Sequence, residues 1–525
     1  MPYQNPSEKQ VRDFIAALVS THVIQNWEAS DEPEHLRTIR DRLLRGGQSH
    51  PKLLRIYRSI LQTGRIPAKD TPEHLKLRFS GAVEVYQGQL RIKNPIYSTI
   101  FNQQWVEQAI KSLSDRPLGT VPLPARQKWI AYPAAIAIGL GMTTVIILAR
   151  VLGVLEGWEL NAFDYWMRSR PPEGADERLF MVTITETDIA SQPVEERGAA
   201  SLSDETLARL IKILEQGKPR VIGLDVYRNQ QVDRRYPALA ESLAKNDQLF
   251  TICHYGKPEE PGKPPPSESP KFQHGFNSVA QDVDGILRRQ VLAVSSPEPC
   301  KNEYSWNWWL AASYLYDEGI KSTSQGDFLQ LGAVPFKRIQ QDTGGYRRLN
   351  NSGHQILLNY RATDHIAETA TLQEVFSEQF DLQRIQDRIV LIGVVAPTFS
   401  DHDWFTPYSR GGRNPRRMSG VEIQAHMTSQ IISAVLDGRP LLWTWPEAIE
   451  TLWIGIWTVT TGVIIIQLRS PHYVPLVVGI MVLSLGGLCW VFICYAGWIP
   501  FVPAALGIVG SGIGVNAYRA AIAKE

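Results

Sequence analysis

The sequence predicts a multi-domain membrane protein, with an α+β cytoplasmic domain, an α/β extracytoplasmic domain and four transmembrane α-helices arranged as one plus three. Two observations lead to this fold class. One uncharged apolar run covers residues 129–149, and two more, 451–468 and 473–518, follow a long polar block. A hydrocarbon core takes about 20 apolar residues per helix. The first two runs therefore span once each, and the third spans twice around a turn at 496–500.

These runs divide the chain into seven segments. In order, we expect a front domain at 1–115, a linker at 116–128, transmembrane helix 1 at 129–149, a large α/β domain at 155–445, and transmembrane helices 2 to 4 at 449–468, 473–495 and 499–518.

The orientation follows from basic residues in the short flanks of the spans. Arg126 and Lys128 precede the first span, Arg469 lies between the second and third, and Arg519 follows the fourth. Basic flanks favour the cytoplasmic side, so both termini of this multi-pass inner (plasma) membrane protein are expected there. The front domain lacks an apolar signal-peptide core, so the first span is expected to act as the targeting signal. No charge lies within the runs, which gives ion or proton transport no support.

The front domain has the pattern of helices followed by a hairpin. Apolar residues recur at helical spacing from 7 to 19, 36 to 44 and 53 to 61, and they alternate around Gln87-Gly88, which predicts a hairpin. This order is typical of a winged helix. One interpretation is nucleic-acid binding through a set of arginines, namely Arg37, Arg40, Arg42 and Arg45. We favour a solvated helix face, because the charge excess is small and no basic tail accompanies it.

Two phrases in this region, NWEASDEPEHLRTIRDRLLR and RIKNPIYSTIFNQQWVEQAI, resemble the C-terminal helical and winged portion of the cyanobacterial AAA-like ATPase family. The resemblance covers roughly residues 8 to 113. Those ATPases place a nucleotide-binding module before this portion, whereas no phosphate-binding G-x-x-x-x-G-K-[ST] motif occurs in this sequence. ATP hydrolysis is therefore not expected. The resemblance leaves an interaction module for a cytoplasmic protein partner.

The block from 155 to 445 alternates apolar strands with helices. The expected strands are 179–184, 220–224, 249–253, 356–359 and 389–392, and the expected helices are 204–215, 237–245, 306–318 and 421–436. Continuous apolar strands between helices predict a mostly parallel sheet covered on both faces.

Several phrases of this block resemble the CHASE2 extracellular sensor domain. They are NAFDYWMR at 161–168, the motif Asp282-x-Asp284-Gly285-x-x-Arg288-Arg289, RIVLIGVVAPTFSDHDWFTPYS, and MSGVEIQAHMTSQIIS. The resemblance implies a signal-sensing receptor with one span before the sensor and three after it. CHASE2 proteins normally continue into an output enzyme. This sequence ends seven residues after the last span, so no output enzyme is expected.

Acidic and hydroxyl side chains follow several of the predicted strands. Ligands bind beyond the carboxyl ends of the strands in an open α/β sheet, so we expect these side chains to converge on a cationic or hydroxyl-rich ligand. The candidates are Glu186, Asp188, Asp225, Thr398 and Asp401. The alternative, favoured for each residue alone, is that each carboxylate caps its own turn. No catalytic group, metal site or cofactor is predicted, and the protein is not expected to be an enzyme.

Two of the four cysteines, Cys253 and Cys300, fall in the outer block. Because an extracytoplasmic compartment is oxidising, a disulfide between them is expected, with two unrelated thiols as the alternative.

The favoured function is therefore a membrane-anchored sensor that passes its signal through the cytoplasmic module. A structural anchor or scaffold without a ligand and a transmembrane effector are the alternatives. The expected partners are the lipid bilayer, an unidentified extracytoplasmic ligand and a cytoplasmic protein. Nucleic acid is not expected, and a homodimer remains open.

Overall fold

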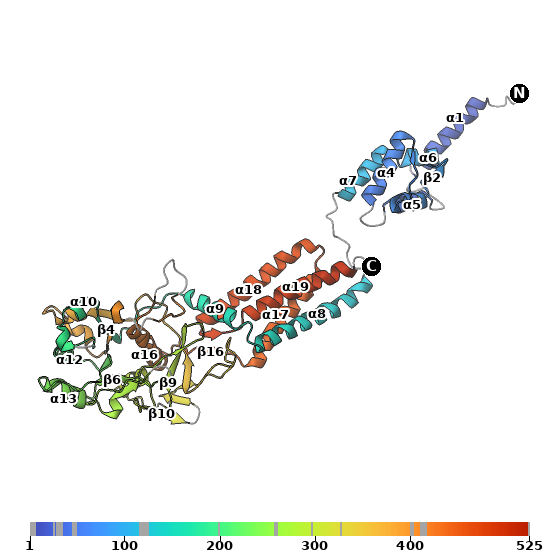
Figure 1. The fold of residues 1–525 in the computed structure, drawn as a ribbon. Coiled ribbons are helices and arrows are strands. Elements are labelled where there is room, and N and C mark those ends of the chain that lie inside the picture. Colours follow the sequence, from blue (N-terminus) through green and yellow to red (C-terminus); the bar gives the residue numbers. More distant parts are fainter. Residues whose placement is uncertain are drawn as a thin grey trace. The chain divides into compact units, whose positions relative to one another are not determined.

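The computed structural model describes residues 7–24, 27, 35–44, 50–114, 125–197, 200–256, 261–295, 298–325, 328–399, 404–409 and 417–522. The chain divides into two compact units, Met1–Pro122 and Leu123–Glu525. Figure 1 shows the elements of both.

The first unit combines helices with a small antiparallel sheet. Its helices are α1 (Glu8–Val19), the π-helical η1 (Ser20–Ile24), α3 (Leu36–Leu44), α4 (His50–Thr63), α5 (Pro72–Phe79), α6 (Pro95–Ile100) and α7 (Gln103–Ser114). Its strands are β1 (Arg65–Pro67), β2 (Val83–Tyr86) and β3 (Gln89–Ile92), in the order β1-β3-β2. The predicted hairpin is present. Gln87 and Gly88 have φ of 51° and 75°, and a two-residue hairpin turn favours such positive φ values.

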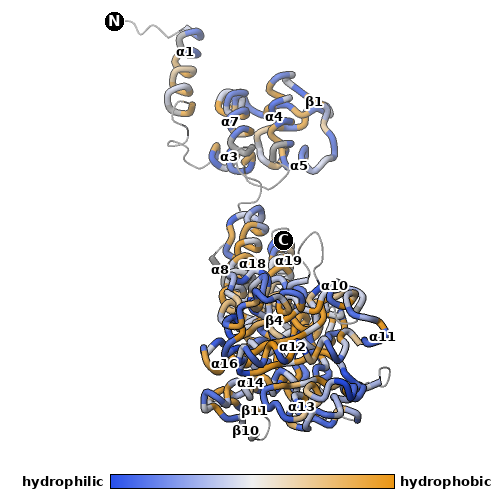
Figure 2. Tube along the Cα trace, turned by 90° about the vertical axis from the view of Figure 1, so that its left-hand side faces the viewer, coloured by the Kyte–Doolittle hydropathy of each residue, from blue (hydrophilic) through white to orange (hydrophobic). Residues whose placement is uncertain are grey.

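The second unit contains a six-stranded sheet in which every pair of neighbouring strands is parallel. The strand order is β14 (Glu368–Thr371), β4 (Leu179–Ile184), β15 (Ile389–Val394), β5 (Val221–Asp225), β6 (Leu249–Cys253) and β7 (His274–Phe276). The central strands are continuous apolar runs because both faces of the sheet are covered. In Figure 2 the trace of β4 is accordingly drawn in the orange of hydrophobic residues.

Alternate residues of the four inner strands, β4, β15, β5 and β6, enter two different cores. One core joins the sheet to α12 (Asp204–Gln216), α13 (Pro237–Lys245) and α15 (Leu372–Phe376). The other joins it to α14 (Trp306–Tyr316) and α16 (Gly420–Leu436). The prediction of a parallel sheet covered on both faces is therefore confirmed.

Two smaller antiparallel sheets adjoin this α/β body. One is ordered β13 (His354–Leu357), β9 (Leu287–Ala293) and β8 (Ala280–Gln281), and the other β10 (Ser322–Gln325), β11 (Phe328–Leu331) and β12 (Val334–Lys337). The strand predicted at 356–359 is β13, so its inclusion in the parallel sheet was wrong. Its residue Ile356 packs in the core with α14 and α16, whereas Leu357 packs in a different cluster with α9 (Glu156–Arg168). Short helices complete the body, namely α10 (Glu186–Ala190), α11 (Val194–Arg197), η3 (Lys271–Gln273), η4 (Leu382–Ile385) and η5 (Pro397–Phe399).

Four long helices lie side by side beyond the α/β body (Figure 1). They are α8 (Ala125–Val151), α17 (Glu447–Gln467), α18 (Val474–Cys494) and α19 (Val502–Ile522), with η6 (Pro471–Tyr473) before α18. Within the described ranges, three segments are long and apolar enough to cross a membrane: Ala131–Val151, Glu447–Gln467 and Pro471–Cys494, with mean hydropathies of 2.0, 1.7 and 2.5.

The helix α19 differs from these three in composition. It carries four glycines, a serine and an asparagine, and Arg519 lies in its last turn. The glycines allow close packing: a Cβ added at Gly510 would lie 2.6 Å from Met142 of α8, and one at Gly512 would lie 2.8 Å from Val478 of α18. Small residues at such positions let helices approach closely.

Candidate functional site

The predicted ligand residues lie at one edge of the parallel sheet. Strands β4, β15 and β5 are adjacent, with Gly393 of β15 paired to Thr183 of β4 and to Asp225 of β5. Their carboxyl ends therefore meet at this edge, as a parallel sheet requires. Glu186 lies two residues beyond β4, Asp225 ends β5, and Thr398 follows β15.

Glu186 and Thr398 are in direct contact although 212 residues separate them. The Thr398 hydroxyl lies 2.7 Å from both Oε1 and Oε2 of Glu186, and the Thr398 backbone N–H donates to Oε2 at 3.4 Å. Both residues are exposed. The strand ends thus bring an accessible carboxylate and a hydroxyl together.

Asp188 is held by the local structure instead. It forms a capping box with Thr185, whose backbone N–H and hydroxyl both donate to Asp188 Oδ2 at 2.7 Å. For this residue the turn-capping alternative describes the contacts. Its second oxygen, Oδ1, is buried without a hydrogen-bond partner among the described residues.

Asp225 is less exposed than Glu186 and less buried than Asp188. It is half-buried, and Oδ1 accepts a hydrogen bond from Asn277 Nδ2 at 3.0 Å. Asn277 in turn accepts one from the Tyr227 hydroxyl at 2.7 Å. Burial raises the pKa of Asp225 to about 6, against the lowering effect of the Asn277 hydrogen bond. This carboxyl group therefore changes charge close to neutral pH.

The fifth candidate, Asp401, lies outside the described residues. Among the described residues, no group of three or more His, Cys, Asp or Glu side chains could hold a metal ion.

A buried ionic network connects this domain to α9. Arg288, on β9, is fully buried and donates two hydrogen bonds to Asp164 of α9, Nε to Oδ1 at 2.7 Å and Nη2 to Oδ2 at 2.8 Å. It also donates to Asp282 at 2.6 Å and to Asp284 at 2.8 and 3.0 Å. Burial lowers the pKa of Arg288, but the hydrogen bonds to Asp164 and Asp284 raise it further above its usual range. Arg288 therefore stays charged.

An Asx turn encloses Gly285, because Asp284 Oδ1 accepts a hydrogen bond from the Ile286 backbone N–H at 3.2 Å. Sequence reasoning missed that these aspartates surround Arg288, although all of them belong to motifs that carry the CHASE2 resemblance.

Charged residues also join two of the long helices. Arg150, in the last turn of α8, pairs with Glu450, in the first turn of α17, and donates to the backbone oxygen of Gly344 at 3.0 Å. Both side chains are buried. The prediction that the spans contain no charge was therefore wrong: an uncharged run stops at the first charged residue, whereas these helices continue past it to the α/β body.

Glu159 of α9 links the α/β body to α19. It is buried, and its carboxylate accepts hydrogen bonds from the backbone N–H groups of Phe501 at 3.1 Å and Val502 at 2.8 Å, at the start of α19. Backbone N–H groups at a helix start lack partners within the helix, and a carboxylate there also interacts favourably with the helix dipole. Burial raises the pKa of Glu159, against these hydrogen bonds.

Trp498 completes this junction between α18 and α19. Gly497 and Trp498 form the short strand β17. It pairs in parallel with β16 (Trp443–Thr444), a strand that lies just before α17 in the sequence. The indole packs on Phe163 of α9 and on Tyr346, with ring centroids 4.5 and 5.6 Å apart. A Cβ added at Gly344 would lie 2.7 Å from the same ring. The segment around Gly344 and Tyr346 therefore contacts both α8, through Arg150, and the turn between α18 and α19, through Trp498.

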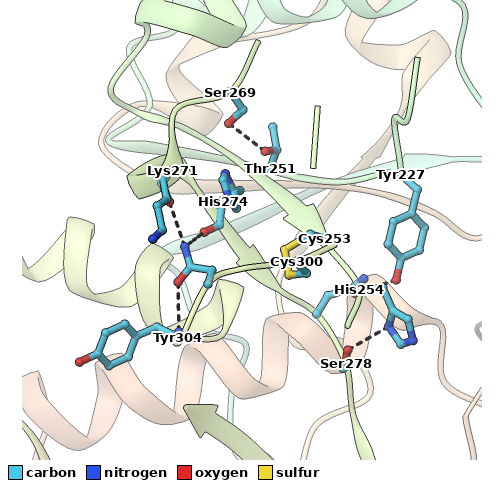
Figure 3. The surroundings of a disulfide bond; sticks show 12 residues. Tyr227, Thr251, Cys253, His254, Ser269, Lys271, His274, Ser278, Cys300 and Tyr304 are labelled. Carbon is cyan, nitrogen blue, oxygen red and sulfur yellow. Dashed lines mark hydrogen bonds between the residues drawn. A yellow bond between two sulfur atoms is a disulfide. The ribbon is translucent and has the colours of Figure 1, made fainter. Parts of the chain in front are cut away.

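Cys253, at the end of β6, and Cys300, shortly before α14, form a disulfide (Figure 3). Their Cα atoms are 5.5 Å apart and both residues are fully buried. The remaining cysteines, Cys489 and Cys494, are free and lie in α18.

Comparison with known proteins gives two matches. Residues 141–463 match the family described as CHASE2 domain. The N-terminal part is similar to an uncharacterised WD repeat-containing protein of Synechocystis sp., with 48% identity over 106 residues, which are 20% of this chain and 9% of that protein. The chain thus spans less than a tenth of this relative. No solved structure matches.

Proposed function

This chain belongs to the CHASE2 family, an extracellular sensor domain family, and we propose that it is a membrane-anchored receptor that reads a ligand at the carboxyl edge of its parallel sheet. The observation that carries the proposal is the direct contact of the sensor domain with α8, α18 and α19. Arg288 holds α9 through Asp164, and Glu159 of α9 holds the start of α19. Buried polar contacts therefore run from Arg288 through α9 to the start of α19.

The ligand site in this proposal is the edge formed by Glu186, Thr398 and Asp225. An accessible carboxylate, a hydroxyl and a carboxyl group that ionises near pH 6 favour a cationic or hydroxyl-rich ligand over an anionic one. The second candidate, a structural anchor without a ligand, is favoured by a specific observation. Asp188 caps its own turn through Oδ2, and the Glu186 carboxylate already binds Thr398.

A thermal-shift screen separates these two functions. The full chain in detergent is heated with polyamines, amino acids and sugars at neutral pH. A sensor is stabilised by a ligand that binds only its folded form. The shift should disappear in Glu186→Ala, and it should persist in Glu241→Gln, which changes an exposed carboxylate on α13. A shift that survives Glu186→Ala would remove the proposed site.

The membrane part of the proposal has four crossings, with α19 as the fourth and both termini in the cytoplasm. The support is its close packing on α8, α17 and α18 and the basic Arg519 at its end. Reporters at the two termini test the number of crossings. Both should be active only on the cytoplasmic side, whereas opposite sides would mean that α19 does not cross.

The side of the sensor domain is tested by a single cysteine. Lys263→Cys in intact cells should react with an impermeant maleimide, and the unsubstituted chain should not, because its two free cysteines lie within α18. Labelling at 263 only after cell lysis would contradict an external sensor.

The first unit is proposed to be the interaction module that contacts a cytoplasmic protein supplying the output. Its support is the pattern of helices and hairpin together with the AAA-like resemblance of residues 8–113. No enzymatic activity is proposed for the chain. The purified protein should neither hydrolyse ATP nor form cyclic nucleotides, and turnover that a point substitution in this chain abolishes would contradict that expectation.

A further inference from the structure

Helix α9 has one buried face and one exposed face of unusual composition. Its buried residues face the sensor domain, α18 and α19; they are Glu159, Leu160, Phe163, Asp164 and Met167. The opposite face carries Gly157, Trp158, Asn161 and Tyr165, with Trp158 60% and Tyr165 57% exposed. A helix that faces water normally presents charged residues on its outer side. This exposed face has none and presents two large amphipathic rings instead.

The exposed apolar surface continues without interruption from α8 into α9. Val145 and Leu148 of α8 are 60% and 59% exposed on a helix apolar enough to cross a membrane. Leu152 and Val154, in the short turn between the helices, are 64% and 66% exposed. The material that surrounds the outer face of α8 can therefore also contact this turn and the start of α9.

Further aromatic residues lie at the same end of the helices. Trp490 of α18 donates its indole N–H to the backbone oxygen of Ser169, which directly follows α9, at 3.0 Å. Trp443 donates in the same way to the backbone oxygen of Tyr495, at the end of α18, at 3.1 Å. The side chains of Trp443, Trp490 and Tyr495 are 37%, 38% and 71% exposed. Tryptophan and tyrosine collect at the level of lipid headgroups because one part of the ring is apolar and another is polar.

We propose that α9 lies in the headgroup region of the bilayer, with Trp158 and Tyr165 directed into the lipid, so that it fastens the sensor domain to the membrane surface. The inference rests on the membrane anchoring proposed above. The occupant is lipid because the face is uncharged, rich in tryptophan and tyrosine, and continuous with the surface of α8. The consequence is that one short helix contacts the lipid on one face and holds both Arg288 and the start of α19 on the other.

Spin labels on the full chain in phospholipid nanodiscs test the proposal. Trp158→Cys and Tyr165→Cys carry the label in a background where Cys489 and Cys494 are replaced by alanine and the disulfide is kept. Leu483→Cys, on the 76% exposed side of α18, is the lipid control, and Phe272→Cys, 62% exposed in the sensor domain, is the water control. The measurement is the ratio of collision with oxygen, which enters lipid, to collision with a polar nickel chelate, which does not.

The ratio at positions 158 and 165 should be several-fold higher than at 272 and lower than at 483. A ratio at 158 and 165 equal to that at 272, with 483 in lipid, would overturn this inference alone. Labels at 158 and 165 that neither probe reaches would overturn it in favour of a protein partner, such as a second copy. A ratio at 483 equal to that at 272 would overturn the membrane anchoring itself.

The unsubstituted protein provides a second measurement that needs no variant. Tyr165 and Tyr316 are the same residue type and are 57% and 66% exposed, so hydroxyl radicals in water should oxidise them at similar rates in the absence of lipid. In nanodiscs, oxidation of Tyr165 should fall several-fold relative to Tyr316. Equal oxidation of the two tyrosines in nanodiscs would contradict the proposal.

Discussion

Replacing Arg288 by methionine should destabilise the sensor domain more than any exposed charge does. The guanidinium is fully buried, and it bridges Asp164, which is 1% exposed, and Asp282, which is 8% exposed. Methionine fills a similar volume but leaves both carboxylates without this cation. Removing one partner of a buried ion pair costs about 3–5 kcal/mol, because an uncompensated buried charge remains.

The assay is thermal unfolding of the full chain in detergent, followed by tryptophan fluorescence. At about 2–4 °C per kcal/mol, Arg288→Met should lower the melting temperature of the sensor domain by about 6 °C or more. The matched control is Lys245→Met, which removes the cation of the exposed Glu241 pair and should change the melting temperature far less, because exposed ion pairs stabilise little. Equal melting temperatures for the two variants would refute the argument that the Arg288 network connects α9 to the sensor domain.

Three further predictions concern other parts of the molecule. Because burial raises the pKa of Asp225 from 3.8 to about 6, the folded state binds this proton more tightly than the unfolded state, and the contribution of Asp225 to stability is full below about pH 4 and lost as the pH rises to about 6. The melting temperature of Asp225→Asn should therefore rise relative to that of the unsubstituted chain between pH 4 and pH 7. A difference in melting temperature that stays constant over this range would contradict the pKa shift. Cys253→Ser should lower the free energy of unfolding by about 2–4 kcal/mol, and non-reduced digests of the native protein should contain the linked peptides; two free thiols that react with iodoacetamide would exclude the bridge. Glu159→Ala should remove the acceptor for the N–H groups of Phe501 and Val502, at about 1–3 kcal/mol, and speed hydrogen exchange at the start of α19 roughly tenfold or more; unchanged exchange there would mean that Glu159 does not hold α19.

The elements that sequence reasoning located well are those whose burial is nearly uniform. Strands β4 and β6 were predicted with their observed bounds, because a strand buried on both faces is an unbroken apolar run. Position along the chain also predicted that Glu186 and Thr398 would meet, since parallel strands end at one edge of the sheet. Their role in ligand binding remains a prediction.

Contacts between residues far apart in the sequence could not be predicted from local apolar patterns. Arg150 and Glu450 are 300 residues apart, and a charged residue next to an apolar run looks like the solvated end of a helix. The predicted segment 356–359 begins with the apolar run of a central strand, yet the strand formed there, β13 (His354–Leu357), pairs antiparallel with β9. Composition reports how much of a strand is buried, whereas the choice of sheet depends on which surfaces the rest of the chain leaves open.

The junction between the sensor and the long helices is suited to transmit a modest binding energy. Coupling between two sites in a protein is typically about 1–3 kcal/mol. The two hydrogen bonds from the start of α19 to Glu159 together account for a similar amount, about 1–3 kcal/mol. In the proposed receptor, a ligand that disturbs this contact would change the start of α19, whereas the rest of the helix stays packed against α8 and α18. Within the sensor domain, Arg288 and the start of α19 are connected through α9, because Asp164 and Glu159 lie on the same helix.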